Sequence, residues 1–193
     1  MKFEKLVRKN RSYRRFDSRR GVSEKTLLEL VDLTRMTPSA ANKQPLKYLL
    51  SCSPESNEKI FETLAWAAYL PDWPGPVAGE RPTAYIVILL DKRISESAGM
   101  DCGIAAQTIL LGAVDRGLGG CMIMNVRKNN LKESLQIDEN LEVLLVIALG
   151  VPVEQVVIEE ISGDGSVKYY RDERMVHHVP KRSLEEIIVR SGS

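Results

Sequence analysis

The sequence predicts an α+β fold of three layers, in which helices cover both faces of a central sheet (α/β/α). Two apolar runs of strand length, residues 84–90 and 143–149, contain no charged residue. Runs of this kind are typical of central strands that are buried on both faces. Segments with helical periodicity alternate with the strand-like runs along the chain, and this alternation favours helices packed on a sheet.

The length and composition fit one domain that spans residues 1–193. The 193 residues are 44% hydrophobic and 27% charged, which is ordinary for a globular protein with a sizeable core. No repeat or low-complexity linker divides the chain. No apolar stretch approaches eighteen residues, and the N-terminus lacks the apolar region of a signal peptide. We therefore expect a cytoplasmic protein without a membrane partner.

The first predicted helix follows the basic N-terminal segment. Ser23 is a good N-cap, Glu24 lies in the first turn, and apolar residues recur up to Thr37. Pro38 ends this helix. Residues 47–52 then predict a strand, and Ser53-Pro54-Glu55 predicts the start of a second helix, whose apolar face carries Ile60, Leu64 and Ala67 or Ala68.

A long irregular loop is predicted over residues 70–82, since four prolines and two glycines fall within these thirteen residues. Long loops in compact domains are often lids or binding loops. The alternative is a plain surface connection in which Trp73 packs on its own domain. The pattern leaves both interpretations open.

The helix predicted from Asp101 to Arg116 is apolar nearly all round, with only Gln107 and Thr108 interrupting the run from Cys102 to Val114. A helix without a polar face must be covered on every side. Small residues along it permit close approach of another helix. We predict that it forms the core of a large homodimer interface, the alternative being burial under the sheet of its own chain.

The glycines of Gly117-Leu118-Gly119-Gly120 invite comparison with a dinucleotide-binding turn. Such a turn follows a strand and opens a helix, whereas this segment follows a helix and leads into the apolar residues 121–124. A glycine C-cap followed by entry into a strand is the better interpretation. The chain thus offers no dedicated nicotinamide-binding module.

The cysteines and histidines predict neither a disulfide framework nor a metal site. Cys52, Cys102 and Cys121 are odd in number and lack metal-ligand spacing, so we expect reduced, buried thiols. His177 and His178 are adjacent and would point to opposite faces of an extended chain.

The charge is distributed unevenly although the net charge is only +1. Nine Lys or Arg and two acidic residues fall within the first twenty positions, and the remainder of the chain is acidic. An acidic remainder repels a polyanion, and no nucleic-acid-binding motif accompanies the basic segment. Nucleic acid is therefore not an expected partner.

Two segments carry the expected chemistry. Arg11, Ser12, Arg14 and Arg15 crowd three guanidiniums and a hydroxyl into five residues, a density suited to a phosphate dianion. The second segment, residues 37–45, is a proline-bounded loop of small residues that lets a flat polar ligand approach closely. The side chains of Asn42 and Gln44 can read the edge of a ring.

In this order, the two segments resemble the flavin-dependent nitroreductase family, whose R-S-x-R element holds the FMN phosphate and whose P-S-x-x-N-x-Q-P loop meets the flavin ring. Residues 100–111 are similar to the central helix of the family, and residues 117–121 to the turn and strand that follow it. Residues 148–150 and 180–186 are similar to its closing signature. The resemblance implies a nitroreductase-like fold and an intertwined homodimer with two FMN sites between the subunits.

The resemblance also implies roles for particular residues. The FMN phosphate would be held by Arg11, Ser12, Arg14, Lys181 and Arg182. The last two precede Ser183-Leu184-Glu185-Glu186, a predicted capping box, and which of them reaches the phosphate stays open. The flavin of the opposite subunit would meet the loop through Pro38, Ser39, Ala40, Asn42 and Gln44. Met124 and Asn125 match the backbone pair beside flavin N5.

The implied function is that of an FMN-dependent NAD(P)H oxidoreductase. Hydride would pass from NADH or NADPH to flavin N5 and then to a small electron-poor acceptor, such as a nitroaromatic or a quinone, in a ping-pong cycle. Because the cofactor carries the chemistry, no catalytic side chain is required. The alternatives are a specialised enzyme of the same fold, such as a reductive dehalogenase or a flavin-fragmenting enzyme, and a flavin-binding protein without turnover. The sequence selects neither the acceptor nor NADH over NADPH.

Overall fold

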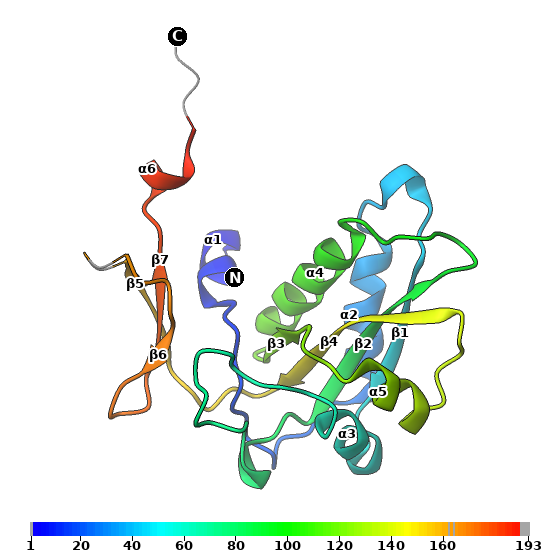
Figure 1. Cartoon of the computed structure of the whole chain (residues 1–193), viewed down its shortest axis with the longest axis horizontal. Coiled ribbons are helices and arrows are strands. Elements are labelled where there is room, and N and C mark those ends of the chain that lie inside the picture. The colour runs from blue at the N-terminus through cyan, green and yellow to red at the C-terminus, as the bar shows by residue number, and fades with distance from the viewer. Residues whose placement is uncertain (1, 162, 164, 190–193) are drawn as a thin grey trace. The chain divides into compact units, whose positions relative to one another are not determined.

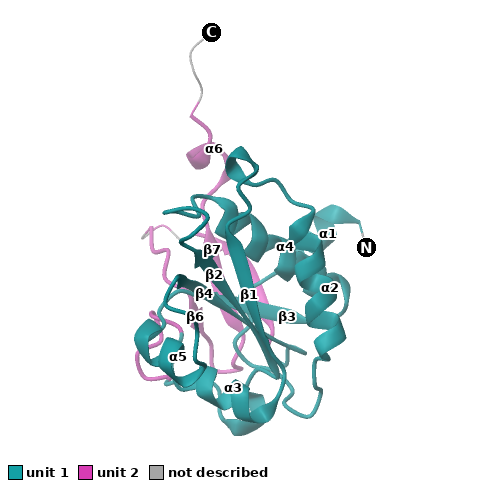
Figure 2. Ribbon diagram, turned by 90° about the vertical axis from the view of Figure 1, so that its right-hand side faces the viewer, with its two compact units in different colours: residues 1–66, 74–153 teal, residues 67–73, 154–193 magenta. Residues whose placement is uncertain are grey.

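The computed structural model describes residues 2–161, 163 and 165–189. The chain forms two compact units, which Figure 2 colours separately: unit 1 comprises residues 1–66 and 74–153, and unit 2 comprises residues 67–73 and 154–193. The helices of unit 1 are α1 (Phe3–Lys9), α2 (Glu24–Arg35), α3 (Pro54–Phe61), α4 (Asp101–Asp115) and α5 (Lys128–Ser134), with short 3₁₀ turns η1 (Ala40–Asn42) and η2 (Ala78–Glu80). Its strands are β1 (Leu46–Ser51), β2 (Ala84–Asp91), β3 (Gly119–Ile123) and β4 (Leu141–Gly150).

The sheet of unit 1 has the strand order β1-β2-β4-β3, and every neighbouring pair is antiparallel. All eight residues of β2 are buried. Ile86 and Ile88 contribute to the apolar cluster on one face of the sheet, while Tyr85 and Val87 contribute to the cluster on the other face. The prediction that residues 84–90 form a central strand buried on both faces is therefore confirmed.

Helices cover both faces of this sheet (Figure 1). α2 and α4 pack on one face, and α3 and α5 lie on the other. The predicted three-layer α/β/α arrangement is confirmed. Ser23 caps α2 as predicted, because its hydroxyl accepts a hydrogen bond from the Thr26 N–H at 3.2 Å.

Close packing requires glycine in the segment after α4. Gly117 has φ +76° and takes the chain out of the helix, as the predicted C-cap does. A Cβ on Gly119 would lie 2.5 Å from Pro152, and one on Gly120 would lie 2.5 Å from the carbonyl oxygen of Ala148. The segment enters β3 directly, so the interpretation as a C-cap followed by a strand is confirmed.

The second predicted helix, α3, is shorter in the structure than the sequence predicts. The second helix was expected to reach Ala67 or Ala68, but α3 ends at Phe61. The helix ends because the next residues form backbone hydrogen bonds with the segment after β3. The Ala65 N–H donates to the Asn125 carbonyl at 3.0 Å, and Leu64 forms a β-bridge with Val126. These tertiary hydrogen bonds override the helical periodicity of Leu64 and Ala67.

The expectation of three buried thiols is wrong for Cys52. Cys121 is buried in β3 and Cys102 is partly buried in α4, whereas Cys52 is exposed. The reason is that β1 ends at Ser51, so Cys52 already belongs to the turn that leads into α3. All three cysteines are free thiols.

Unit 2 contains a small sheet of order β5-β7-β6, made of β5 (Val156–Glu160), β6 (Tyr170–Arg171) and β7 (His177–Lys181), followed by α6 (Leu184–Ile187). Residues 67–73, which include the first four residues of the predicted long loop, belong to this unit. Trp73 packs under the guanidinium of Arg171, 4.1 Å from it, and Arg171 forms a buried ion pair with Glu154 at 3.2 Å. Trp73 thus packs within its own unit, as the plain-connection interpretation expects.

His178 joins all three strands of the small sheet. Its Nδ1 lies 2.9 Å from Glu159 of β5, its Nε2 lies 3.4 Å from Asp172 after β6, and its ring stacks on Tyr170. A neutral imidazole has one N–H, so only the protonated ring can donate to both carboxylates. The hydrogen bond to Glu159, supported by Asp172, raises the pKa of His178 above its ordinary value.

We expect the small sheet to lose stability as the pH rises. The pKa of His178 is higher in the folded chain than the ordinary value of about 6.5, so the stabilisation is complete below about pH 6.5 and disappears as the pH rises through the folded-state pKa. Titration of the His178 ring protons by NMR measures that pKa. Thermal unfolding of His178→Gln should show a smaller pH dependence than the unsubstituted protein, and a ring that titrates at or below the ordinary value would contradict this account.

Candidate active site

The arginine-rich segment lies along the open edge of β3. After α1 the chain becomes extended, Ser12 forms a parallel bridge with Gly120, and the Tyr13 N–H donates to the Gly120 carbonyl at 3.0 Å. The segment therefore continues the sheet by one more position beyond β3. This pairing holds the backbone of Ser12 and Tyr13 in place. It therefore fixes the positions from which the side chains of Arg11 and Arg14 extend.

The three arginines of the segment have different environments. Arg15 forms a partly buried two-point ion pair with Glu80, with Nε 2.6 Å from Oε2, and so fastens the segment to η2. Arg14 donates from Nη1 to the Ser12 carbonyl at 3.2 Å. Arg11 donates from Nη2 to Val7, but its buried Nε has no hydrogen-bond partner among the described residues. Glu80 thus engages Arg15, while the anion-binding roles of Arg11, Ser12 and Arg14 stay predictions.

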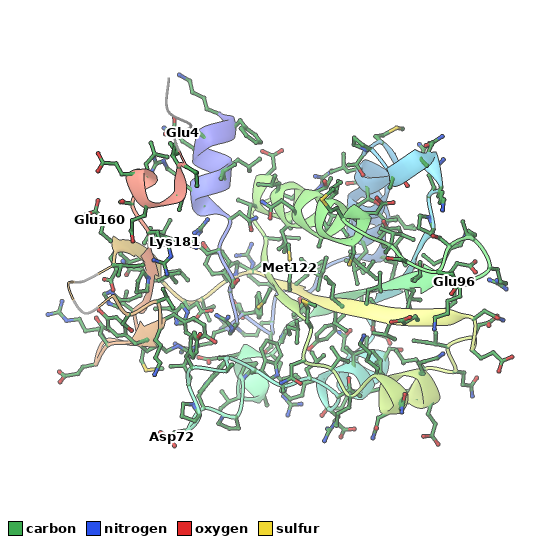
Figure 3. All side chains as sticks on the ribbon, turned by 45° about the horizontal axis from the view of Figure 1, so that its top comes forward. Glu4, Asp72, Glu96, Met122, Glu160 and Lys181 are labelled. Carbon is green, nitrogen blue, oxygen red and sulfur yellow. The ribbon has the colours of Figure 1, made fainter. Side chains whose placement is uncertain are left out.

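Met124 and Asn125 follow the last residue of the same strand. Met124 is 74% exposed, and the Asn125 carbonyl accepts the hydrogen bond from Ala65. The Asn125 N–H makes no hydrogen bond to the described part of the chain. At about 3.3 Å per residue, Met124 lies about 13 Å along the strand from Gly120, where Ser12 is paired. Met122, which is labelled in Figure 3, lies in β3 two residues before Met124 and marks this strand in the picture.

The predicted ring-contacting loop has a strained backbone. Ala41, Asn42 and Gln44 have φ values of 50°, 52° and 51°, a region that side-chain-bearing residues seldom occupy. Backbone strain of this kind persists only where the surroundings enforce it, and it is concentrated at functional sites. Here the loop is held at the start of α4, where the carboxylate of Asp101 accepts hydrogen bonds from the Ser39 hydroxyl at 2.6 Å and the Ala40 N–H at 3.0 Å.

A cavity of about 290 Å³ opens beside this loop. Its walls come from the end of α2, the loop, β1 and the start of α4, and they include Pro38, Ser39 and Gln44. Tyr48 lines it and accepts a hydrogen bond from the Thr34 hydroxyl at 3.0 Å; burial raises the pKa of this tyrosine. The cavity is therefore mixed in polarity, with hydroxyl groups among apolar walls.

Lys181 and Arg182 belong to unit 2 and are both exposed. Lys181 ends β7 opposite Glu160 of β5, and Figure 3 shows these two side chains on neighbouring strands. Arg182 lies 3.3 Å from Glu186. The predicted capping box is present, since the Ser183 and Glu186 side chains each accept the other residue's backbone N–H.

Within unit 1, the structure brings the predicted residues together in two groups. Arg11, Ser12 and Arg14 share the β3 edge with Met124 and Asn125, whereas the loop precedes β1 at the opposite edge of the sheet. Four strand spacings separate β1 from the Ser12 segment, or about 19 Å at about 4.8 Å each.

The sequence model of the nitroreductase family matches residues 7–151. The chain belongs to this family. A nitroreductase is an oxidoreductase, so the chain is an enzyme of that class. The match contains unit 1 almost completely, including both groups of predicted site residues, and ends before β5; the roles of Lys181 and Arg182 therefore stay predictions.

Relatives and solved structures agree with this assignment. The chain is 30% identical over 155 residues to a Methanothermobacter thermautotrophicus protein named "Putative NADH dehydrogenase/NAD(P)H nitroreductase", with 77% of this chain and 76% of the relative covered. It resembles a nitroreductase family protein from Clostridium novyi NT, with a TM-score of 0.65, 27% identity and coverage of 79% and 87% of the two chains. It shares its fold with an FMN-dependent nitroreductase from Clostridium difficile R20291, with a TM-score of 0.62, 20% identity and coverage of 78% and 87%.

Two residues at this nitroreductase's candidate site were missed by the sequence analysis. Asp101 holds the loop, and its signal was a charged residue at the start of an otherwise apolar helix. Glu80 engages Arg15 of the predicted anion-binding segment, but nothing in the sequence around Glu80 points to a partner 65 positions away. No described helix is both long enough and apolar enough to span a bilayer, and the described residues contain no group of three His, Cys, Asp or Glu suited to a metal ion.

Proposed function

We propose that this nitroreductase acts as an FMN-dependent NAD(P)H oxidoreductase and that residues 1–193 form one FMN-binding domain within a homodimer. FMN is its cofactor, NADH or NADPH is its transient reductant, and the second substrate is a small electron-poor molecule such as a nitroaromatic or a quinone. The observation that carries the proposal is the arrangement along β3, where anion-binding groups and an unbonded backbone N–H lie on one strand edge.

The residues along this edge fit a phosphate monoester joined to a polar ring. The buried Nε of Arg11 lacks a partner among the described residues, and an unsatisfied buried donor costs free energy that a phosphate oxygen would recover. Arg14 and Ser12 lie within the same four residues. The Asn125 N–H is available to a ring heteroatom about 16 Å further along the strand from Gly120, at about 3.3 Å per residue.

A site shared by two chains accounts for the separation of the two residue groups. A mononucleotide that contacts Arg11 and Arg14 at the β3 edge leaves the loop of the same chain at the far edge of the sheet. In a homodimer, the loop of the partner copy can complete the site. The exposed face of α4, which includes Gly103, Ile104 and Gln107, supports this arrangement because it offers small and apolar residues to a second helix, while Ala105, Ala106 and Ile109 are already buried within the chain.

The chemistry that FMN supplies when bound is hydride transfer, from the nicotinamide and then to the acceptor. The protein's own residues bind and orient. Arg11, Ser12 and Arg14 hold the phosphate together with Lys181 or Arg182, and Pro38, Ser39, Ala40, Asn42 and Gln44 line the ring. Asn125 donates its N–H beside the reacting edge, and Met124 forms the adjacent apolar wall. No side chain is assigned a catalytic proton transfer.

The identity of the bound flavin tests this proposal. We expect the purified protein to be yellow and to release FMN on denaturation, because unit 1 offers one cluster of phosphate ligands and its glycine-rich turn is occupied by packing. Absorbance and mass spectrometry of the released molecule measure this. Recovery of FAD alone, or a colourless protein that FMN cannot reconstitute, would contradict the proposal.

A further inference from the structure

We propose that Asp101 is a positioning residue that sets the flavin-contacting shape of the 38–44 loop. The inference rests on the proposed function, since it assigns a role toward the same ligand. Asp101 is the first residue of α4 and is only 6% exposed. Its carboxylate does not cap its own helix, because both oxygens are directed to the loop: Oδ2 accepts from the Ser39 hydroxyl and Oδ1 from the Ala40 N–H.

The hydrogen bonds continue from Ser39 through the loop. The Ser39 hydroxyl donates to Asp101, and its oxygen accepts the Gln44 N–H at 2.9 Å. Gln44 in turn donates from Nε2 to the Asn42 side-chain oxygen at 3.0 Å and to its carbonyl at 3.1 Å. A connected path of short contacts thus runs from a buried carboxylate to the two exposed amides that are proposed to read the ring.

This path determines which groups the loop presents to a ligand. The side-chain oxygen of Asn42 accepts a hydrogen bond from Gln44, which leaves the amide N–H groups of Asn42 as its donors toward a ligand. Gln44 uses its Nε2 within the loop and offers its Oε1. The loop therefore presents a donor beside an acceptor, which complements a ring edge carrying a carbonyl next to an N–H, as the pyrimidine edge of a flavin does.

The backbone strain explains why a charged anchor is needed. Three residues of the loop that are not glycine have positive φ, and each would leave this conformation if the surrounding bonds were lost. Hydrogen bonds to an ionised carboxylate are about twice as strong as those between neutral groups. Asparagine at position 101 keeps the size of the side chain but has only one oxygen, so one of the two donors from the loop would face an N–H₂ group.

The test compares the affinities of four apo proteins for FMN and for riboflavin: the unsubstituted protein, Asp101→Asn, Asp32→Asn and Ser39→Ala. Quenching of flavin fluorescence on binding measures each affinity. Asp101→Asn should weaken both ligands on the order of tenfold, the effect of losing about one charged hydrogen bond, and the ratio of the two affinities should stay constant because the phosphate site is untouched. Amide exchange at Ala40 and Gln44 should become faster in the apo protein. Asp32→Asn, which removes an exposed carboxylate paired with Arg35, is the matched control. It should change neither the flavin affinities nor the amide exchange rates.

Ser39→Ala is the fourth protein and covers the case in which Asp101→Asn fails to fold. It deletes the hydroxyl that connects Asp101 to Gln44 but leaves the hydrogen bond from the Ala40 N–H. We therefore expect it to weaken the binding of both FMN and riboflavin, as Asp101→Asn does. Unchanged affinities and unchanged exchange in these variants would overturn the positioning role alone. Failure of the unsubstituted apo protein to bind either flavin would overturn the proposed function and, with it, the ligand assigned to the loop.

Discussion

Replacement of Arg14 by Ala should weaken FMN binding by about 1.5 to 3 kcal/mol, a factor on the order of ten to more than a hundred, which is the range for losing a charged hydrogen bond. The affinity for riboflavin should barely change, because the lost contact is to the phosphate. Titration of the apo protein with each flavin measures the two affinities. The fold should survive, since the Arg14 side chain is not part of either apolar cluster.

Arg19→Ala is a suitable control for this experiment. Arg19 belongs to the same basic segment but is paired with Asp17 at 2.8 Å and is highly exposed. Its replacement lowers the local positive charge by the same amount and should leave FMN affinity nearly unchanged. Equal effects of the two replacements would mean that general charge, and not a phosphate contact by Arg14, governs binding.

Mixing Arg14→Ala with Asn42→Ala chains should restore activity that each variant lacks alone. If Arg14 comes from one subunit and Asn42 from the other, a heterodimer has one site with both lesions and one site with none. Random exchange at equal concentrations makes about half of the dimers heterodimers, so the mixture should recover about a quarter of the unsubstituted activity. Steady-state oxidation of NAD(P)H with a quinone acceptor measures this.

The complementation experiment needs exchange of subunits, which an apolar interface through α4 would slow. Mild denaturant followed by refolding, with the heterodimer identified by mass, provides it. Heterodimers that are as inactive as either parent would show that Arg14 and Asn42 serve a site within one subunit. Such a result would contradict the shared site while leaving the FMN assignment, tested by the riboflavin comparison, intact.

The layers of the fold could be predicted because their signals are local. The uninterrupted apolar run of β2 and the capping residue Ser23 each act within a few positions, and the structure has both elements where the patterns predict them. α1, α5 and the strands of unit 2 were not predicted. They are short, and the two-residue strand β6 has no periodicity to detect.

The candidate site was predictable as two sequence segments but not as an arrangement. Residue types and spacing predict Arg11, Ser12 and Arg14 as anion-binding groups and Asn42 and Gln44 as ring-reading groups, and these roles stay predictions. The assignment of Lys181 and Arg182 to the same phosphate still rests on resemblance. Composition could not separate Arg15 from its neighbours, because its role depends on a partner from a distant loop.

The sequence by itself determined the fold class and the order of the main elements, and it predicted the two segments that are proposed to carry the chemistry, since each of these patterns depends on residues close in the chain. Only the tertiary structure decided that Glu80 engages Arg15, that backbone bonds after β3 end α3 early, and that Asp101 holds the strained loop. The physical reason is that these interactions join residues far apart in the sequence, and a hydrogen bond of this kind exists only once the sheet has brought its two partners together.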